Sequence, residues 1–178
     1  MILKIIVAVL VVIGAVLLFA ASKPNTFIVQ RSIVIDAPPE KVFALVNDLH
    51  NWPKWAPQDR EDPYMKRTFS GTASGVGAVS DWTGSGNTGA GRMTITDSQP
   101  SQRISVRVDW ARPFVATNIN DFVLQPAGAS TNLVWTMRGP NLYPMKIMSV
   151  FVNMDRSMGK HFEAGLANLK QTAEYGSK

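Results

Sequence analysis

Few residues of this 178-residue chain have the type and spacing that catalysis requires. Its two histidines, His50 and His161, stand far apart, and the scattered carboxylates follow no metal-ligand spacing. Asp109 and Asp121 fall on predicted strands but not as a facing pair, so they give no sign of paired-carboxylate chemistry. The chain has no cysteine, which excludes thiol nucleophiles, disulfides and thiolate metal sites. The sequence therefore predicts no catalytic constellation, no metal site and no cofactor.

Three polar residues share strand faces with apolar residues and are better candidates for a binding role. Arg67 alternates with Met65 and Phe69, and Asn118 and Asn120 precede apolar residues of the same parity. Buried polar groups need partners, and an unpaired buried arginine is very costly. We hypothesise that these three residues form a polar spot that holds a ligand carboxylate or hydroxyl. The alternative is a strand end that opens to solvent.

Alternating apolar and polar residues predict a series of β-strands after residue 26. Turn-forming residues separate the strands, and 126–130 is a strong hairpin signal. The acidic residue and prolines of 36–40 predict the start of a helix after the first strand. The predicted strands are 27–36, 64–70, 77–82, 91–96, 103–110, 117–125 and 132–138.

After residue 139 the apolar residues recur every three or four positions, which predicts one amphipathic helix of about 25 residues. Its apolar face would carry Ile147, Phe151, Met154, Met158, Phe162, Leu166 and Leu169. The order of elements predicts an α+β fold, in which a curved, seven-stranded antiparallel sheet wraps around this long C-terminal helix. Such a fold often leaves a pocket between sheet and helix.

Side-chain parity predicts which residues would line that pocket, because alternate residues of a strand share a face. The alternative is that the same side chains form a filled core. The candidate lining residues are Arg67, Trp82, Met93, Ile95, Trp110, Asn118, Asn120, Phe122, Trp135, Met137, Met154, Met158 and Phe162.

The segment 5–21 contains no polar side chain and predicts a single membrane-spanning helix. A cleaved signal peptide would have a shorter apolar region and a clearer cleavage site, and a buried core helix would have a polar face. We expect 1–24 to be the anchor with the start of a linker, and 25–178 to be one domain on the extracytoplasmic (periplasmic) side. A linker of about five residues, 22–26, reaches at most ~18 Å, so the domain would sit against the bilayer.

The charge pattern argues against nucleic acid as a partner. The formal net charge is +5, but the basic residues are scattered and no aromatic residues are interleaved with them.

Six segments, in an order that covers nearly all of residues 27–173, carry a resemblance to a known family: 31–43, 46–49, 52–57, 70–77, 133–139 and 162–169. Through them the chain resembles the SRPBCC superfamily, which includes the START, pollen-allergen and polyketide cyclase/dehydrase-like helix-grip proteins. The resemblance implies a cavity for a hydrophobic ligand. It implies no catalytic motif that could be carried over to residues of this chain.

We therefore expect a membrane-anchored module that binds an apolar or lipid-like small molecule. One alternative is a polyketide cyclase/dehydrase-like enzyme, which would need His161 or Arg67 to line a pocket beside a second titratable group. The other is a ligand-free interaction or stress-related domain. A cavity of at least ~300 Å³ would distinguish the first two from the third.

Overall fold

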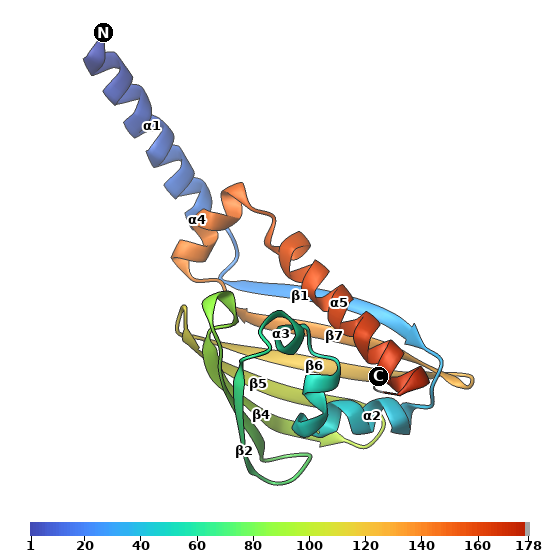
Figure 1. Cartoon of the computed structure of the whole chain (residues 1–178). Coiled ribbons are helices and arrows are strands. Elements are labelled where there is room, and N and C mark those ends of the chain that lie inside the picture. The colour runs from blue at the N-terminus through green and yellow to red at the C-terminus, as the bar shows by residue number, and fades with distance from the viewer. Residues whose placement is uncertain (177–178) are drawn as a thin grey trace.

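A computed structural model describes residues 1–176, apart from the side chains of Asn87 and Met154. Figure 1 shows a curved antiparallel sheet with the helix α5 (Met154–Tyr175) across its concave face. The sheet has seven strands in the order β1-β7-β6-β5-β4-β3-β2, so that β1 joins the far end of a meander. The predicted seven-stranded helix-grip fold is confirmed. The strands are β1 (Thr26–Ile35), β2 (Lys66–Gly71), β3 (Ala78–Thr83), β4 (Ala90–Gln99), β5 (Arg103–Arg112), β6 (Ala116–Ala127) and β7 (Ser130–Pro140).

The hairpin between β6 and β7 forms where the sequence predicts it. Ala127 and Ser130 are paired, which leaves only Gly128 and Ala129 in the turn. Gly128 has φ +65°, a conformation that residues with a side chain rarely adopt.

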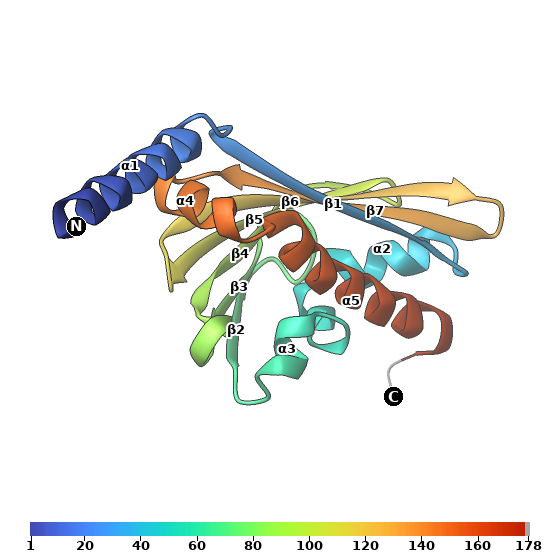
Figure 2. The ribbon, with the colours of Figure 1, turned by 90° about the horizontal axis from the view of Figure 1, so that it is seen from above.

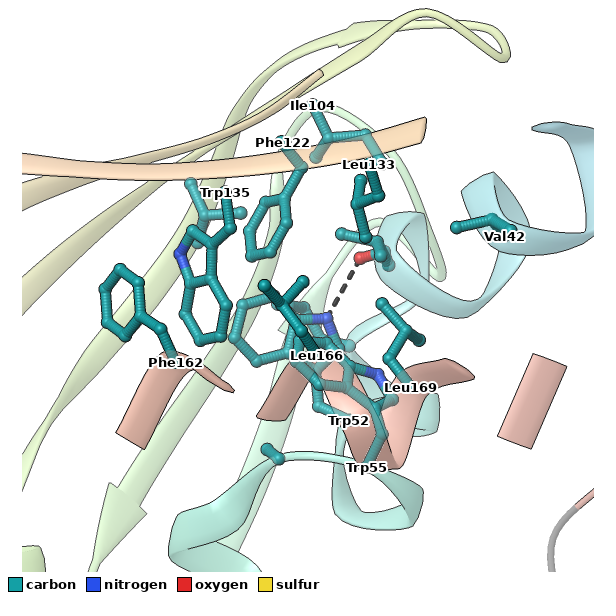
Figure 3. Close-up of a cluster of buried hydrophobic side chains, with 14 of the residues drawn as sticks. Val42, Trp52, Trp55, Ile104, Phe122, Leu133, Trp135, Phe162, Leu166 and Leu169 are labelled. Carbon is teal, nitrogen blue, oxygen red and sulfur yellow. Dashed lines mark hydrogen bonds between the residues drawn. The ribbon is translucent and has the colours of Figure 1, made fainter. Parts of the chain in front are cut away.

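Three short helices follow β1 and cover the concave face beside α5: α2 (Pro39–Asn47), η1 (Leu49–Lys54) and α3 (Pro57–Glu61). The indole of Trp52 donates to the carbonyl of Val46 at 2.9 Å, and that of Trp55 donates to Leu45 at 3.2 Å. Because the carbonyls of α2 satisfy both N–H groups, the two tryptophans can be buried. They pack edge-on against Phe122 in the core that Figure 3 shows.

The single C-terminal helix of the prediction is two helices, α4 (Tyr143–Phe151) and α5. The side chain of Asn153 caps α5 by accepting from the backbone N–H of Arg156 at 2.9 Å. Phe151 is 74% exposed, whereas Phe162, Leu166 and Leu169 of α5 are buried against the sheet. The apolar period continues across 152–153 because α4 also has an apolar side, but α4 packs mainly beside α1.

The predicted apolar N-terminal helix is α1 (Ile2–Ala21), which projects away from the sheet (Figures 1 and 2). It is exposed along most of its length, and Ala20 is its only buried residue. It is long and apolar enough to cross a membrane, although a signal sequence would meet the same criteria. The proposed division at 24/25 remains a prediction, and residues 177–178 of the expected domain lie outside the described part.

Candidate ligand-binding site

A small cavity lies between the concave face of the sheet, α3 and α5, with a volume of about 50 Å³. Its wall is mostly aromatic and aliphatic, and its polar side chains are Gln58, Asn120 and His161. The lining residues are Trp52, Trp55, Ala56, Gln58, Met93, Val108, Trp110, Asn120, Trp135, Met137, His161 and Phe162.

Trp135 is at the centre of the aromatic wall, as Figure 3 shows. Its ring stacks on Phe162 of α5, with centroids 4.0 Å apart and an interplanar angle of 7°. On its other side it stacks on Phe122, at 5.0 Å and 29°. Trp135 therefore joins the sheet to α5 directly beside the cavity.

The two predicted asparagines serve as partners for tryptophan N–H groups. The Oδ1 of Asn120 accepts from the indole of Trp135 at 2.8 Å. The Asn118 amide, oriented with its oxygen toward Trp110, accepts from that indole at 3.2 Å. Within the described part of the chain, every buried side-chain polar atom has a hydrogen-bond partner. These amides therefore orient the aromatic wall, and only Asn120 reaches the cavity.

Arg67 already has an anionic partner inside the protein. Its guanidinium makes a bidentate contact with Asp59 of α3, at 2.8 and 2.7 Å, and donates to Ser80 at 3.2 Å. The side chains of Arg67 and Asp59 are only 6% and 12% exposed. Arg67 does not line the cavity. It lines a neighbouring hollow that shares Gln58, Met93 and Trp110 with it. A ligand carboxylate at Arg67 would have to displace Asp59.

The structure places the predicted lining residues in different surroundings. Ile95 and Phe122 are fully buried core residues, and Trp82 packs edge-on against Trp110. Met158 lines a second hollow, and the side chain of Met154 lies outside the described residues. Those that line the cavity are Met93, Trp110, Asn120, Trp135, Met137 and Phe162.

Apart from Val108 of β5, the lining residues outside the candidate set come from or adjoin the helices. Trp52, Trp55, Ala56 and Gln58 belong to or adjoin η1 and α3, whose position over the sheet is a tertiary feature. In the sequence, the two tryptophans within 52–55 were the one signal that this segment could contribute to the cavity wall.

His161 is at the edge of the cavity and next to a carboxylate. Its Nδ1 lies 3.4 Å from Oε1 of Glu61, and the two side chains are 29% and 61% exposed. His50, by contrast, bonds to Asp48 at 2.8 Å in η1 and stacks on Phe69, away from the cavity. Among the described residues, no cluster of three histidine or acidic side chains could hold a metal ion.

Two further hollows adjoin α4. One, of about 190 Å³, lies between β1, α4 and α5 and includes Val29, Met145 and Met158 in its lining. The other is an open depression of about 460 Å³ beside Lys23 and the break between α4 and α5.

The family model described as "Polyketide cyclase / dehydrase and lipid transport" matches residues 26–174. The chain belongs to this family. The match begins at the first residue of β1, so it covers the sheet and nearly all of α5 but not the apolar helix α1.

Solved structures share the fold of this chain at low sequence identity. Protein CV1439 from Chromobacterium violaceum is 18% identical, with a TM-score of 0.59 over 85% of this chain and 99% of its own. TTHA0849 from Thermus thermophilus is 18% identical, with a TM-score of 0.60 over 85% and 100%. The Aha1 dimer from Colwellia psychrerythraea is also 18% identical, with a TM-score of 0.58 over 85% and 99%. No curated protein matches the chain.

In this family member the two halves of α5 are held in different ways. The N-terminal half is held by Arg31 of β1, which bonds to Asp155 at 3.1 Å and to Glu163 at 2.9 Å. The C-terminal half buries Leu166, Leu169 and Ala173. The first two turns of α5, before buried Phe162, therefore depend largely on partly exposed ion pairs, and the rest of the helix depends on core packing.

We expect Arg31→Ala to loosen the N-terminal half of α5 selectively, because it removes the bonds to Asp155 and Glu163. Hydrogen exchange of the backbone amides in 155–162 should become faster, while the amides of 166–173 keep their protection. Lys170→Ala is the matched control, since Lys170 bonds to Glu174 at 2.9 Å in the other half. Equal changes from both variants would contradict the difference between the two halves.

The same contact predicts a dependence on pH. The hydrogen bond from Arg31 lowers the pKa of the Asp155 carboxyl below its ordinary value of 3.8. A carboxyl with a lowered folded-state pKa stabilises the fold above its unfolded-state pKa, and this contribution is lost as pH falls through the folded-state value. Protection of the first turns of α5 should therefore be constant near neutral pH and fall below about pH 4. In Asp155→Asn this acid-induced loss, followed by hydrogen exchange, should be smaller.

Proposed function

We propose that this domain binds an apolar small molecule between the sheet and α5, and that α1 holds it at a membrane. The proposal rests on one observation, the aromatic cavity beside Trp135, which lies between the sheet and α5. The indole N–H groups of Trp110 and Trp135 donate to asparagines, and those of Trp52 and Trp55 donate to backbone carbonyls, so the wall offers an incoming molecule chiefly apolar surface. Family membership supports a hydrophobic ligand.

A ligand must enlarge this cavity. Its volume of about 50 Å³ is well below the ~300 Å³ at which small-molecule sites begin, so the cavity as it stands does not distinguish a ligand-binding domain from a ligand-free one. The first two turns of α5, before Phe162, are the part that can move most readily, since they are held by the Arg31 ion pairs and follow a helix break. Met93 and Met137 add wall side chains that adapt to different shapes. We propose that α5 swings outward about its buried C-terminal half when ligand enters.

The anchor would bring the domain close to its source of ligand. Only residues 22–25 separate α1 from β1, so a retained α1 keeps the domain at the bilayer surface. We propose the extracytoplasmic side for the domain. If the domain is extracytoplasmic, a cysteine introduced at exposed Ala129 should react with a membrane-impermeant maleimide in intact cells. The chain has no other cysteine, so the label would report on this position alone.

Native mass spectrometry of the full chain, released gently from membranes, tests the binding proposal. We expect a co-purifying apolar molecule whose occupancy falls in Met137→Trp, a change that fills the cavity. Val76→Trp, in the exposed turn between β2 and β3, is the control and should retain the ligand. Repeated preparations without any bound molecule, together with unchanged Tm in the presence of lipid extracts, would favour the ligand-free alternative instead.

One observation favours an enzyme as the second candidate. His161 lines the cavity and is paired with Glu61, which meets the requirement for a histidine beside a second titratable group. If the pair acts as a general base on a bound substrate, His161→Gln should abolish turnover of the co-purified molecule without abolishing its binding. If the recovered molecule is chemically the same after incubation with either protein, the enzymatic alternative fails.

A further inference from the structure

Helix α4 is attached to the last turns of α1. The hydroxyl of Tyr143 donates to the carbonyl of Leu17 at 3.0 Å, and the ammonium of Lys23 donates to that of Ser149 at 2.9 Å. Ala20, the one buried residue of α1, is on the same turns. Figures 1 and 2 both show α4 beside the domain end of α1. The depth of α4 is therefore set by the depth of residues 17–23.

The length of α1 then determines that depth. Its 20 residues extend about 30 Å, which is the thickness of a bilayer's hydrocarbon core. If α1 spans the bilayer, its last turn must reach the boundary between hydrocarbon and headgroups. Because α4 bonds to that turn, it must lie at the same boundary.

The surface of α4 suits such a position. Leu142, Tyr143, Met148, Phe151 and Val152 are each more than 40% exposed, and Phe151 reaches 74%. A short helix with an exposed apolar side is typical of segments that lie in the membrane interface, where tyrosine is also enriched.

A second apolar tip lies at the same end of the sheet. Phe114 and Val115, in the loop between β5 and β6, are 68% and 80% exposed. The β5–β6 and β1–β7 pairings place this loop at the sheet end where β1 begins and α1 is attached. Exposed Arg112 precedes the tip, and Lys23 lies beside α4, so both parts carry a cation for lipid phosphates.

We propose that α4 and the β5–β6 loop form a membrane-contact surface that enters the headgroup region of the bilayer beside α1. This surface rests on the proposed anchoring and extends it, because it fixes the orientation of the domain as well as its location. The hollow of about 190 Å³ between β1, α4 and α5 adjoins the surface. An apolar molecule leaving the bilayer would therefore meet the domain beside the movable half of α5.

Single cysteines in this cysteine-free chain allow a direct test. Phe114→Cys, Phe151→Cys, Val76→Cys and Ala129→Cys would each be labelled with the fluorophore NBD. The full chain would be reconstituted in vesicles of phosphatidylcholine with a minority of phosphatidylglycerol. We expect labels at 114 and 151 to emit at shorter wavelength and to be quenched by brominated lipids. Labels at 76 and 129, in turns at the opposite end of the sheet, should behave as in water.

A fifth label, at Leu10→Cys within α1, separates the two proposals. If it is quenched by brominated lipids while 114 and 151 remain in water, the anchor stands and the contact surface is overturned. If the label at position 10 is itself in water or lost by cleavage, both fail. The emission of the labels at 114 and 151 could also shift to shorter wavelength without being quenched by brominated lipids. Protein, such as a second copy of the chain, would then cover the surface, and this result also overturns the proposal. Unchanged Tm values for the labelled variants would show that they are folded.

Discussion

Replacing Asp59 with alanine should destabilise the domain by about 3–5 kcal/mol, because it leaves the guanidinium of Arg67 buried without its anion. The Arg67 side chain is 6% exposed and makes both of its short ionic contacts with Asp59. Its remaining side-chain partner, the hydroxyl of Ser80, cannot neutralise the charge. Urea unfolding of the full chain in detergent, followed by tryptophan fluorescence, would measure the loss.

Two controls distinguish the cost of leaving a buried charge unpaired from the loss of an ion pair in itself. Asp81→Ala breaks the Arg92–Asp81 pair, whose side chains are 38–58% exposed, and should cost less than about 1 kcal/mol. The double variant Asp59→Leu with Arg67→Met removes both charges and should recover most of the stability. If Asp59→Ala lowers the free energy of unfolding no more than Asp81→Ala does, water must reach the guanidinium of Arg67.

This prediction also affects how Arg67 is tested as a ligand contact. Arg67→Glu would place two carboxylates side by side in a buried site, so lost binding could result from lost folding. The double neutral variant is the better probe. If it folds and still carries an acidic lipid, Arg67 has no part in ligand recognition.

Trp135→Ala should cost about 3–5 kcal/mol, the range observed for truncation of large aromatic residues in cores. The variant loses the stacking on Phe162 and Phe122 and leaves Asn120 without its indole donor. It also opens a space next to the existing cavity, with the shape of an indole ring. We therefore expect added indole to raise the Tm of this variant and not that of the unchanged protein.

Trp135→Phe separates the contribution of stacking from that of the hydrogen bond to Asn120, because it keeps an aromatic ring in the stack and removes the indole donor. Leaving the buried oxygen of Asn120 without its donor should cost about 1–3 kcal/mol. If indole stabilises both proteins equally, its binding is unrelated to the cavity.

The seven strands and the sheet-and-helix architecture could be predicted because their signals are local. Alternating residues, turn residues and the Pro126–Ser130 hairpin each act over a few positions, and strands joined by short turns pair with their neighbours. The C-terminal helix was predicted too long because periodicity does not show which partner an apolar side will have. Ile147 and Phe151 continue the period of α5 but belong to α4, which packs beside α1.

The candidate site was harder to predict, for a related reason. Parity correctly placed Trp135 and Met137 on the inner face, but a face contains both core residues and cavity residues. Phe122 is fully buried because Trp52 and Trp55 lie on it, and those two residues come from a helix whose position no local pattern reveals. Likewise, nothing in the spacing of Asp59 and Arg67 predicts that they would meet.

By itself, the sequence determined the apolar helix α1, the seven strands, the inward faces of the sheet and the family. Each of these follows from the chemistry of residues close together in the chain. Only the tertiary structure decided how much space is left inside, which polar groups neutralise one another, and which apolar surface remains uncovered. These depend on the packing of segments distant in sequence, so the placement of η1 and α3 over the sheet reduces the predicted cavity to about 50 Å³. The placement of α4 leaves an apolar surface beside α1.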